Sequence, residues 1–314
     1  TNVRLESFVY TKESFEQAKK HLTDRGVFIL YNYYRKTWLV DKLAGMLQDV
    51  FQQNPISYSV GEAAKLAVLM VGPRINDLSP SATLIPYTIQ HTETPATDNW
   101  PFLYLRGPNI PALYTHFLLV ILAIIFIVTT GTLLYKRSRF DLRFFLFGAA
   151  FLLLETKNLV TFGLLFGSTW QVNAVVFAVI LLSVLSANLL SMHFTIRPTW
   201  ILYLALGTSI GVAALLPKSF LLSLPELTRY TVASVIYFAP VVFANLIFSQ
   251  LFGKSHDPTV SLGSNILGAV IGGLLEYSSL TFGYNTLYII IALCYMLAFF
   301  LPSNTFFYAT SQRH

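Results

Sequence analysis

Long apolar segments alternate with short polar loops over the last two-thirds of the chain. Seven of them are about 17–25 residues long, enough to cross roughly 30 Å of hydrocarbon as helices at 1.5 Å per residue. Their apolar residues run continuously, which excludes the alternating pattern of a membrane β-barrel strand. The pattern predicts seven transmembrane helices at residues 112–135, 144–166, 171–192, 199–217, 230–252, 262–280 and 284–302.

The first 75 residues show a different pattern, in which helix and strand signals alternate. Thr11 is the expected N-cap of the first helix, and the nearly continuous apolar run Val27–Tyr31 predicts a strand buried on both faces. The expected elements are helices at 12–23 and 36–53 and strands at 27–31, 56–60 and 66–71. This order predicts an α/β layered segment in front of a mainly α-helical membrane bundle.

Three parts follow from this organisation: an α/β segment over residues 1–75, a linker and pre-membrane segment over 76–110, and a helical transmembrane domain over 111–314. The pattern of the first residues is typical of the interior of a domain, so we expect further sequence upstream. Aromatic residues before the first apolar segment suit a belt at the membrane interface. They are Trp100, Phe102, Tyr104 and Tyr114.

Charge is distributed unevenly along the chain. Only 11% of residues are charged, against about 25% in a soluble domain, and 21 of the 36 charged side chains precede residue 111. The formal net charge of +6 does not indicate nucleic-acid binding, because the basic excess lies in loops between apolar segments, where it reports orientation. Counting these charges puts the soluble segment outside the cytoplasm, but one miscounted span or helices upstream of residue 1 would reverse this orientation, which the sequence leaves open. The partner that the composition predicts is the lipid bilayer.

Charged and amide side chains inside the apolar segments are the candidate functional residues. Glu155 and Lys157 lie in mid-segment, where a charge costs about 2.5–3.5 kcal/mol and therefore faces protein or a water-filled cavity. Three interpretations remain open for these two: a substrate, ion or headgroup site, a structural ion pair, and two charges that lie nearer the membrane interface. Glu276, later in the chain, is able to pair with Lys157, and a structural role is favoured. Asn188 is the fourth candidate, and hydrogen bonds between helices explain it adequately.

No catalytic or metal-ligating set stands out. The six histidines show no metal-ligand spacing, and neither a nucleophile elbow nor a phosphate-binding loop is present. Gly-xxx-Gly spacings, such as Gly268-xxx-Gly272, favour close packing of helices inside the bundle over dimerisation. Cys294 is the single cysteine, which rules out an internal disulfide.

Several stretches together resemble one family. It comprises bacterial polytopic membrane proteins with a fused spermidine-synthase-like, S-adenosylmethionine-methyltransferase-type domain. In the soluble part the resemblance lies in residues 5–15, 26–32 and 97–105, and in the membrane part in residues 152–158, 165–174, 186–189 and 265–277. It covers most of the chain.

The resemblance implies that residues 1–75 are the C-terminal part of a Rossmann-like transferase domain in the bacterial cytoplasmic (inner) membrane. The cofactor loop, the ribose-binding acid and the catalytic aspartates of the family would precede Thr1, so no catalytic residue is carried over. Asp98 matches the stretch that closes the domain. S-adenosylmethionine or its decarboxylated form is implied for the full-length family, and no cofactor for this chain alone.

Three functions compete at this point. The first is a membrane-anchored aminopropyl- or methyltransferase, of which this chain is the C-terminal part without the catalytic half. The second is a transporter or channel for a small solute, motivated by Glu155 and Lys157 at membrane depth. The third is a non-catalytic structural subunit of a membrane complex, with other subunits as partners.

Overall fold

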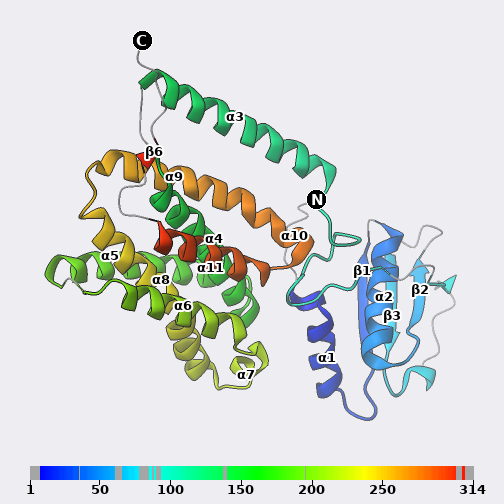
Figure 1. Ribbon diagram of the computed structural model, residues 1–314. Helices are drawn as coiled ribbons and strands as arrows, with labels where there is room; N and C mark the ends of the chain where they lie inside the picture. The colour runs from blue at the N-terminus through cyan, green and yellow to red at the C-terminus, as the bar shows by residue number, and fades with distance from the viewer. Residues whose placement is uncertain are drawn as a thin grey trace. The chain divides into compact units, whose positions relative to one another are not determined.

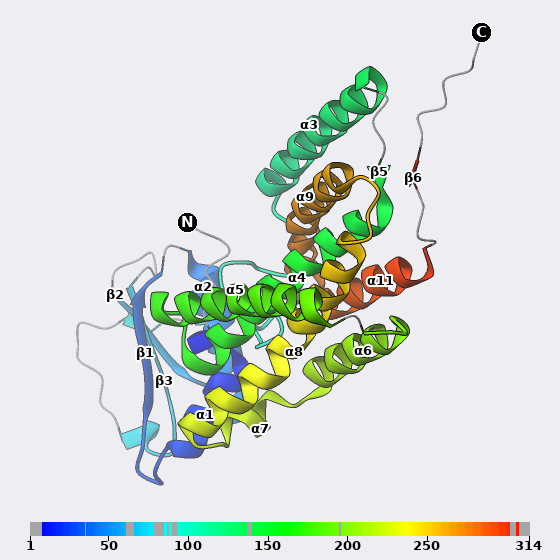
Figure 2. The ribbon, with the colours of Figure 1, turned by 90° about the vertical axis from the view of Figure 1, so that its left-hand side faces the viewer.

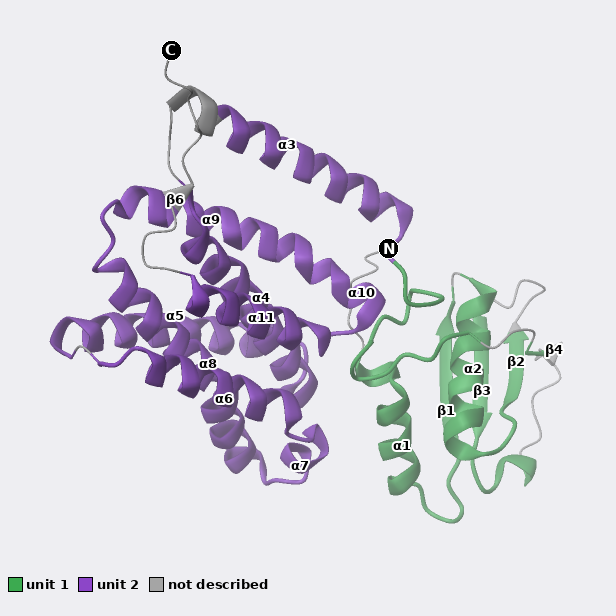
Figure 3. Ribbon diagram, in the orientation of Figure 1, with its two compact units in different colours: residues 1–109 green, residues 110–314 purple. Residues whose placement is uncertain are grey.

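The computed structural model describes residues 8–34, 36–60, 66–77, 85–86, 88–89, 93–136, 140–194, 196–301 and 306–307. It divides the chain into two compact units, residues 1–109 and 110–314 (Figure 3). We call them the soluble unit and the membrane unit. Most of the described residues are helical, which confirms the mainly α class.

The soluble unit combines two α-helices with a small sheet (Figure 1). Its elements are η1 (Phe8–Tyr10), α1 (Lys12–His21), β1 (Phe28–Tyr33), α2 (Thr37–Phe51), β2 (Ile56–Val60), β3 (Leu66–Val71), η2 (Ile75–Asp77) and β4 (Ile85–Pro86). The strand order is β1-β3-β2-β4, and β3 is antiparallel to both β1 and β2. Strands β1 and β2 are therefore parallel, and α2 is the crossover connection between them.

Local sequence explains how α1 begins. The Thr11 side chain accepts a hydrogen bond from the Ser14 backbone N–H, which confirms the predicted N-cap, and Glu13 lies in the first turn. Phe15, on the inner face of α1, is almost fully buried and packs edge-on against Phe28 of β1. The cap and the buried ring together fix where α1 starts and which face it turns to the core.

One face of the sheet carries the core of the soluble unit. Leu43 and Leu47 of α2 and Leu69 of β3 are fully buried in one cluster. On the opposite face Tyr31 is 77% exposed and Tyr33 61% exposed. The prediction that this strand is buried on both faces is therefore wrong: β1 lies at the end of the described strand order, and the helices cover only one side.

Residues 93–105 belong to the soluble unit, although they were predicted as part of a linker. The Lys12 backbone N–H donates to the Ala96 carbonyl over 2.9 Å, and Trp100 and Phe102 are buried. The predicted interfacial aromatic belt is thus wrong for these two rings. Their apolar surface completes the core of the soluble unit, which a pattern of polar and Pro residues does not indicate.

The membrane unit is a set of helices joined by short loops. Its elements are α3 (Ala112–Lys136), β5 (Phe140–Asp141), α4 (Leu142–Phe166), α5 (Trp170–His193), α6 (Trp200–Leu215), α7 (Lys218–Leu222), α8 (Glu226–Phe252), α9 (Pro258–Leu275), η3 (Glu276–Ser278), α10 (Ser279–Phe282), α11 (Thr286–Phe300) and β6 (Phe306–Phe307). Among the described residues, five helical segments are long and apolar enough to cross a membrane. They are Ala112–Gly131, Leu142–Phe166, Trp170–His193, Glu226–Phe252 and Pro258–Phe282.

The structure also differs from the sequence prediction in the number of helices that are long enough to cross a membrane. The predicted spans 199–217 and 284–302 form helices of 16 and 15 residues. At 1.5 Å per residue these are about 24 and 22 Å long, shorter than the roughly 30 Å hydrocarbon layer. The structure thus supports five membrane-crossing helices and a membrane protein, while seven spans stay a prediction.

Helix α4 lies at the centre of the membrane unit and packs along α9, with α5, α8 and α11 also against it (Figure 2). Its start is set by Asp141, whose side chain accepts from the backbone N–H groups of Arg143 and Phe144. Close packing with α9 depends on Gly148, Gly268 and Gly272, where an added Cβ would overlap the backbone of the opposite helix. The Gly268-xxx-Gly272 spacing therefore serves packing inside the bundle.

Candidate functional site

The central helix α4 carries a buried cation deep in the membrane unit. Lys157 lies three residues past the midpoint of α4. Three residues correspond to a distance of about 4.5 Å along the helix axis. Its side chain is only 2% exposed. A cation this deep in a bundle marks a functional-site hypothesis, and its partners decide which kind.

The partners of the Lys157 ammonium group are neutral. Nζ donates to Oδ1 of Asn285 over 3.3 Å and lies over the rings of Tyr288 at 5.1 Å and Tyr284 at 5.9 Å. Within the described residues no carboxylate lies within 4.0 Å of it. The charged side chain with which it interacts is Lys218, and that interaction is repulsive. Rings and an amide orient the ammonium group but leave its charge uncompensated.

Polar atoms also lack a hydrogen-bond partner on Asn158, which follows Lys157 in α4, and on Tyr237, which interacts electrostatically with Tyr288. Asn158 is fully buried and donates through Nδ2 to the Tyr237 carbonyl over 2.9 Å, but its Oδ1 accepts from no described group. The Tyr237 hydroxyl, on α8, is buried and equally unpartnered. We call Lys157, Asn158, Tyr237, Asn285 and Tyr288 the Lys157 cluster. A buried polar atom left unpaired costs about 1–3 kcal/mol, so the cluster suits a group that supplies the missing bonds.

The chemistry of the cluster favours a ligand with a negative charge or strong acceptors. The ammonium group has three N–H donors, and Asn285 is the acceptor that the described residues offer it. The Tyr237 hydroxyl is a further donor. A small carboxylate or phosphate would complete these bonds and neutralise the cation. A polyamine would instead add positive charge beside Lys157.

The other predicted residues do not belong to the cluster. Glu276 follows the end of α9 and accepts from the Thr156 hydroxyl over 3.4 Å, so its pairing with Lys157 is not formed. Glu155 is half-buried on a different face of α4. Asn188 is exposed on α5, and the described residues offer it no hydrogen bond. The structure thus brings only Lys157 of the four into a buried polar cluster.

Sequence reasoning missed Tyr237, Tyr284, Asn285 and Tyr288. Tyrosines are ordinary members of apolar segments, and nothing in their spacing marks a hydroxyl without a partner. The signal that was available is the pair Tyr284-Asn285 after Gly283, a break between two apolar segments. Short breaks of this kind place backbone and side-chain polar groups at membrane depth.

A second buried lysine, Lys42, holds the soluble unit together. Its side chain is fully buried, and Nζ donates to the carbonyls of Leu105 over 2.7 Å and Phe102 over 3.3 Å and lies 4.7 Å from the Trp100 ring. Asp98 is also part of this anchoring, because its carboxylate accepts from the Thr11 hydroxyl over 2.8 Å. These contacts explain why residues 98–105 fold onto the soluble unit.

The stability of this anchor is expected to rise in alkaline solution. Burial lowers the pKa of Lys42 from 10.5 to about 8, an effect that Glu93 partly offsets. Between about pH 8 and 10.5 the unfolded chain therefore binds a proton that the folded chain has released, and the free energy of unfolding increases with pH. Hydrogen exchange of the peptide 93–105, corrected for the intrinsic pH dependence, should slow across this window in the full chain. In Lys42→Met the slowing should be absent; an equal slowing there would contradict the assignment to Lys42.

The chain was compared with protein-family models, curated proteins and solved structures, and none of them matches it. Nor do three or more His, Cys, Asp or Glu side chains gather into a possible metal site in the described part of the chain.

Proposed function

We propose that this chain is the C-terminal, membrane-embedded part of a transferase of the spermidine-synthase-like or methyltransferase type. The supporting observation is the connection β1-α2-β2, in which a helix links two parallel strands. A strand–helix–strand unit is the building block of Rossmann-like domains. The antiparallel β3 lies between the two parallel strands of this unit. The resemblance in residues 26–32 and 97–105 points the same way.

In this proposal the two units have different tasks. The soluble unit is the last part of a sheet whose cofactor-binding half precedes Thr1, and the bundle holds the transferase beside a substrate in the bacterial cytoplasmic membrane. The cofactor is S-adenosylmethionine or its decarboxylated form. The binding groups for it lie upstream, so residues 1–314 by themselves bind neither.

Calorimetric titration tests this proposal directly. The full-length product of the gene, in mild detergent, is titrated with S-adenosylmethionine and with its decarboxylated form, and the chain of residues 1–314 is the matched control. We expect heat of binding with one of the two for the full-length protein and none for the control. Absence of heat with both cofactors in the full-length protein would contradict a transferase role.

The Lys157 cluster favours a second candidate function, a binding site or pathway for a small anionic solute through the bundle. Its support is the ammonium group, which no carboxylate neutralises among the described residues, together with the unpartnered Tyr237 hydroxyl, because both are donors. The unpartnered Asn158 Oδ1 is an acceptor and would need a donor such as a hydroxyl group on the solute. Both functions are compatible in one protein, since the proposal places the transferase site upstream of Thr1, whereas the cluster lies in the membrane unit. Lys157→Met is the variant that tests the second function.

A further inference from the structure

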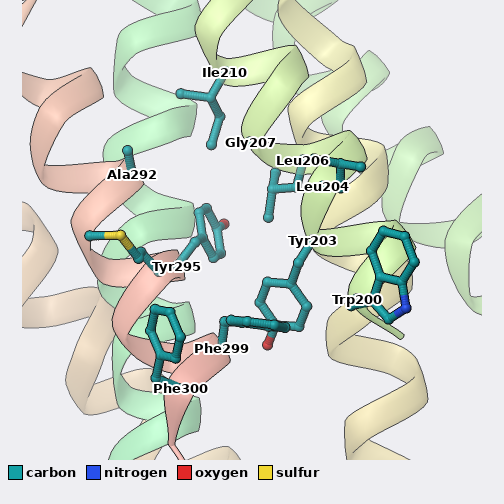
Figure 4. Close-up of a pocket in the computed structure, with 11 residues that line it drawn as sticks. Trp200, Tyr203, Leu204, Leu206, Gly207, Ile210, Ala292, Tyr295, Phe299 and Phe300 are labelled. Atoms are coloured by element: carbon teal, nitrogen blue, oxygen red, sulfur yellow. The ribbon is translucent and has the colours of Figure 1, made fainter. Parts of the chain in front are cut away.

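A groove of about 450 Å³ lies between helices α6 and α11 of the membrane unit (Figure 4). Trp200, Leu204, Met296 and Phe300 at its rim are at least half exposed, whereas Leu206 and Ile210 in its wall are buried. The lining is almost wholly aliphatic and aromatic. A groove of this size and character matches the sites that hold one small apolar ligand or chain.

The length of the groove fits one leaflet of a bilayer. Its lining runs along α6 from Trp200 to Ile210, ten residues or about 15 Å of helix. Half of a hydrocarbon layer of roughly 30 Å is the same distance. A lipid acyl chain that starts at the Trp200 end would therefore be covered over its depth in one leaflet.

Polar groups without partners gather at the Trp200 end and the inner wall of this groove. The rings of Tyr203 and Tyr295 project into the space between the two helices from opposite sides (Figure 4). Both hydroxyls are buried and have no hydrogen-bond partner among the described groups, and Tyr295 is only 3% exposed. Two O–H donors in an apolar groove call for an acceptor on the ligand.

Arg143 supplies a positive charge at the same place. Its Nε is buried and unpartnered, and its guanidinium interacts electrostatically with Tyr203. One turn further along α4, Phe147 contacts the rings of both Tyr203 and Tyr295. Residues four apart lie on one helix face, so Arg143 is on the side of α4 that faces the groove. As the second residue of α4, it is at the end of a membrane-spanning segment, the level of lipid headgroups.

We propose that the groove between α6 and α11 binds an anionic phospholipid, with one acyl chain along Trp200–Ile210 and the phosphate held by Arg143 and Tyr203. The guanidinium of Arg143 binds the phosphate by charge-assisted hydrogen bonds. The apolar wall of the groove packs against the acyl chain. Tyr295, deeper in the groove, is placed to donate to an ester carbonyl. The site is independent of the Lys157 cluster and of the transferase proposal.

Native mass spectrometry of the full chain in mild detergent tests the headgroup. Phosphatidylglycerol and phosphatidylcholine of equal chain length are compared, and we expect the protein to retain phosphatidylglycerol more strongly. Arg143→Gln should lower the affinity for phosphatidylglycerol about tenfold and leave phosphatidylcholine unchanged. The matched control is Lys254→Gln, which removes an exposed charge after α8 and should bind as the wild type does. Equal binding of the two lipids by the wild type would overturn the proposal.

Two glycine variants test whether the groove binds the acyl chain of the lipid. Gly207 lines the groove, and a Cβ there meets nothing within 4 Å, so Gly207→Phe fills the groove without displacing backbone. We expect it to lose both lipids. Gly211→Phe is the control, because Gly211 has equal space but does not line the groove. Tyr295→Phe removes only a hydroxyl and should weaken phosphatidylglycerol binding severalfold. Wild-type retention of lipid by Gly207→Phe, in protein that remains monodisperse, would overturn the site.

Discussion

Gly268→Val is expected to destabilise the membrane unit by more than about 3 kcal/mol or to cause its aggregation. A Cβ at Gly268 would overlap the backbone carbonyl of Phe145 on α4, and one at Gly148 would overlap the carbonyl of Asn265 on α9. The obstacle in each case is backbone, which moves only if the two helices separate. Overpacking of a core by a few atoms costs about 1–3 kcal/mol, and here the cost should exceed 3 kcal/mol because side-chain rotation gives no relief.

Separation of the two helices would also break polar contacts between them. Asn265 Nδ2 donates to the Phe144 carbonyl over 3.1 Å, and the Asp141 backbone N–H donates to the Ser264 hydroxyl over 2.9 Å. Both bonds depend on the close approach that the glycines permit. Their loss in a membrane leaves polar groups without water to replace the partner, so the two penalties add.

Purification in mild detergent, followed by denaturant titration, measures the effect. We expect Gly268→Val to give aggregated protein or a free energy of unfolding at least 3 kcal/mol below that of the wild type. Gly263→Val is the matched control on the same helix, since a Cβ at Gly263 meets nothing within 4 Å. Equal stability of the two variants would show that the contact of α4 with α9 does not depend on Gly268.

Lys157→Met is expected to raise the stability of the bundle and to remove its affinity for anions. The ammonium group is buried among rings and an amide, with no carboxylate within 4.0 Å in the described part of the chain. Methionine retains a flexible chain of similar length without the charge. Replacing a buried ion pair by apolar groups of similar volume is neutral or stabilises proteins by about 1–4 kcal/mol. Among the described residues Lys157 has no carboxylate partner to leave unpaired, so we expect a gain of about 1–3 kcal/mol.

Two measurements separate a ligand site from a structural one. Denaturant titration should show the gain for Lys157→Met and a change within about 0.5 kcal/mol for the exposed control Lys254→Met. Liposomes that contain the wild type should accumulate a small carboxylate or inorganic phosphate, and those with Lys157→Met should not. A loss of more than 1 kcal/mol of stability in Lys157→Met would mean that the cation holds the bundle together. Unchanged uptake would remove the second candidate function.

The elements that were predicted correctly are those that depend on residues close together in the sequence. Thr11 caps α1 because its hydroxyl reaches a free backbone N–H three residues on, and this depends on neighbours in sequence. Helix α4 extends from Leu142 to Phe166, close to the predicted 144–166, because a long apolar run leaves a helix as the only open structure that satisfies its backbone in lipid. The exposed face of β1 and the burial of Trp100 were missed, because both depend on which distant segments cover them.

The sequence revealed one residue of the candidate site, and the tertiary structure revealed its partners. Lys157 was visible as a charge in an apolar run, but sequence left open whether Glu276 would neutralise it. The tertiary structure pairs Lys157 with Asn285 and two tyrosine rings and pairs Glu276 with Thr156. Residues from α4, α8 and the start of α11 meet there only because α4 lies at the centre of the packing. No periodicity within one helix carries that information.

The sequence by itself determined that most of this protein is apolar helix in lipid behind an α/β segment, because length and hydropathy are properties of each segment alone. Only the tertiary structure decided which polar groups are left without partners, at Lys157 and in the groove between α6 and α11. Burial and hydrogen bonding are properties of pairs of segments, as at the contact of α4 with α9, which the glycines of both helices permit.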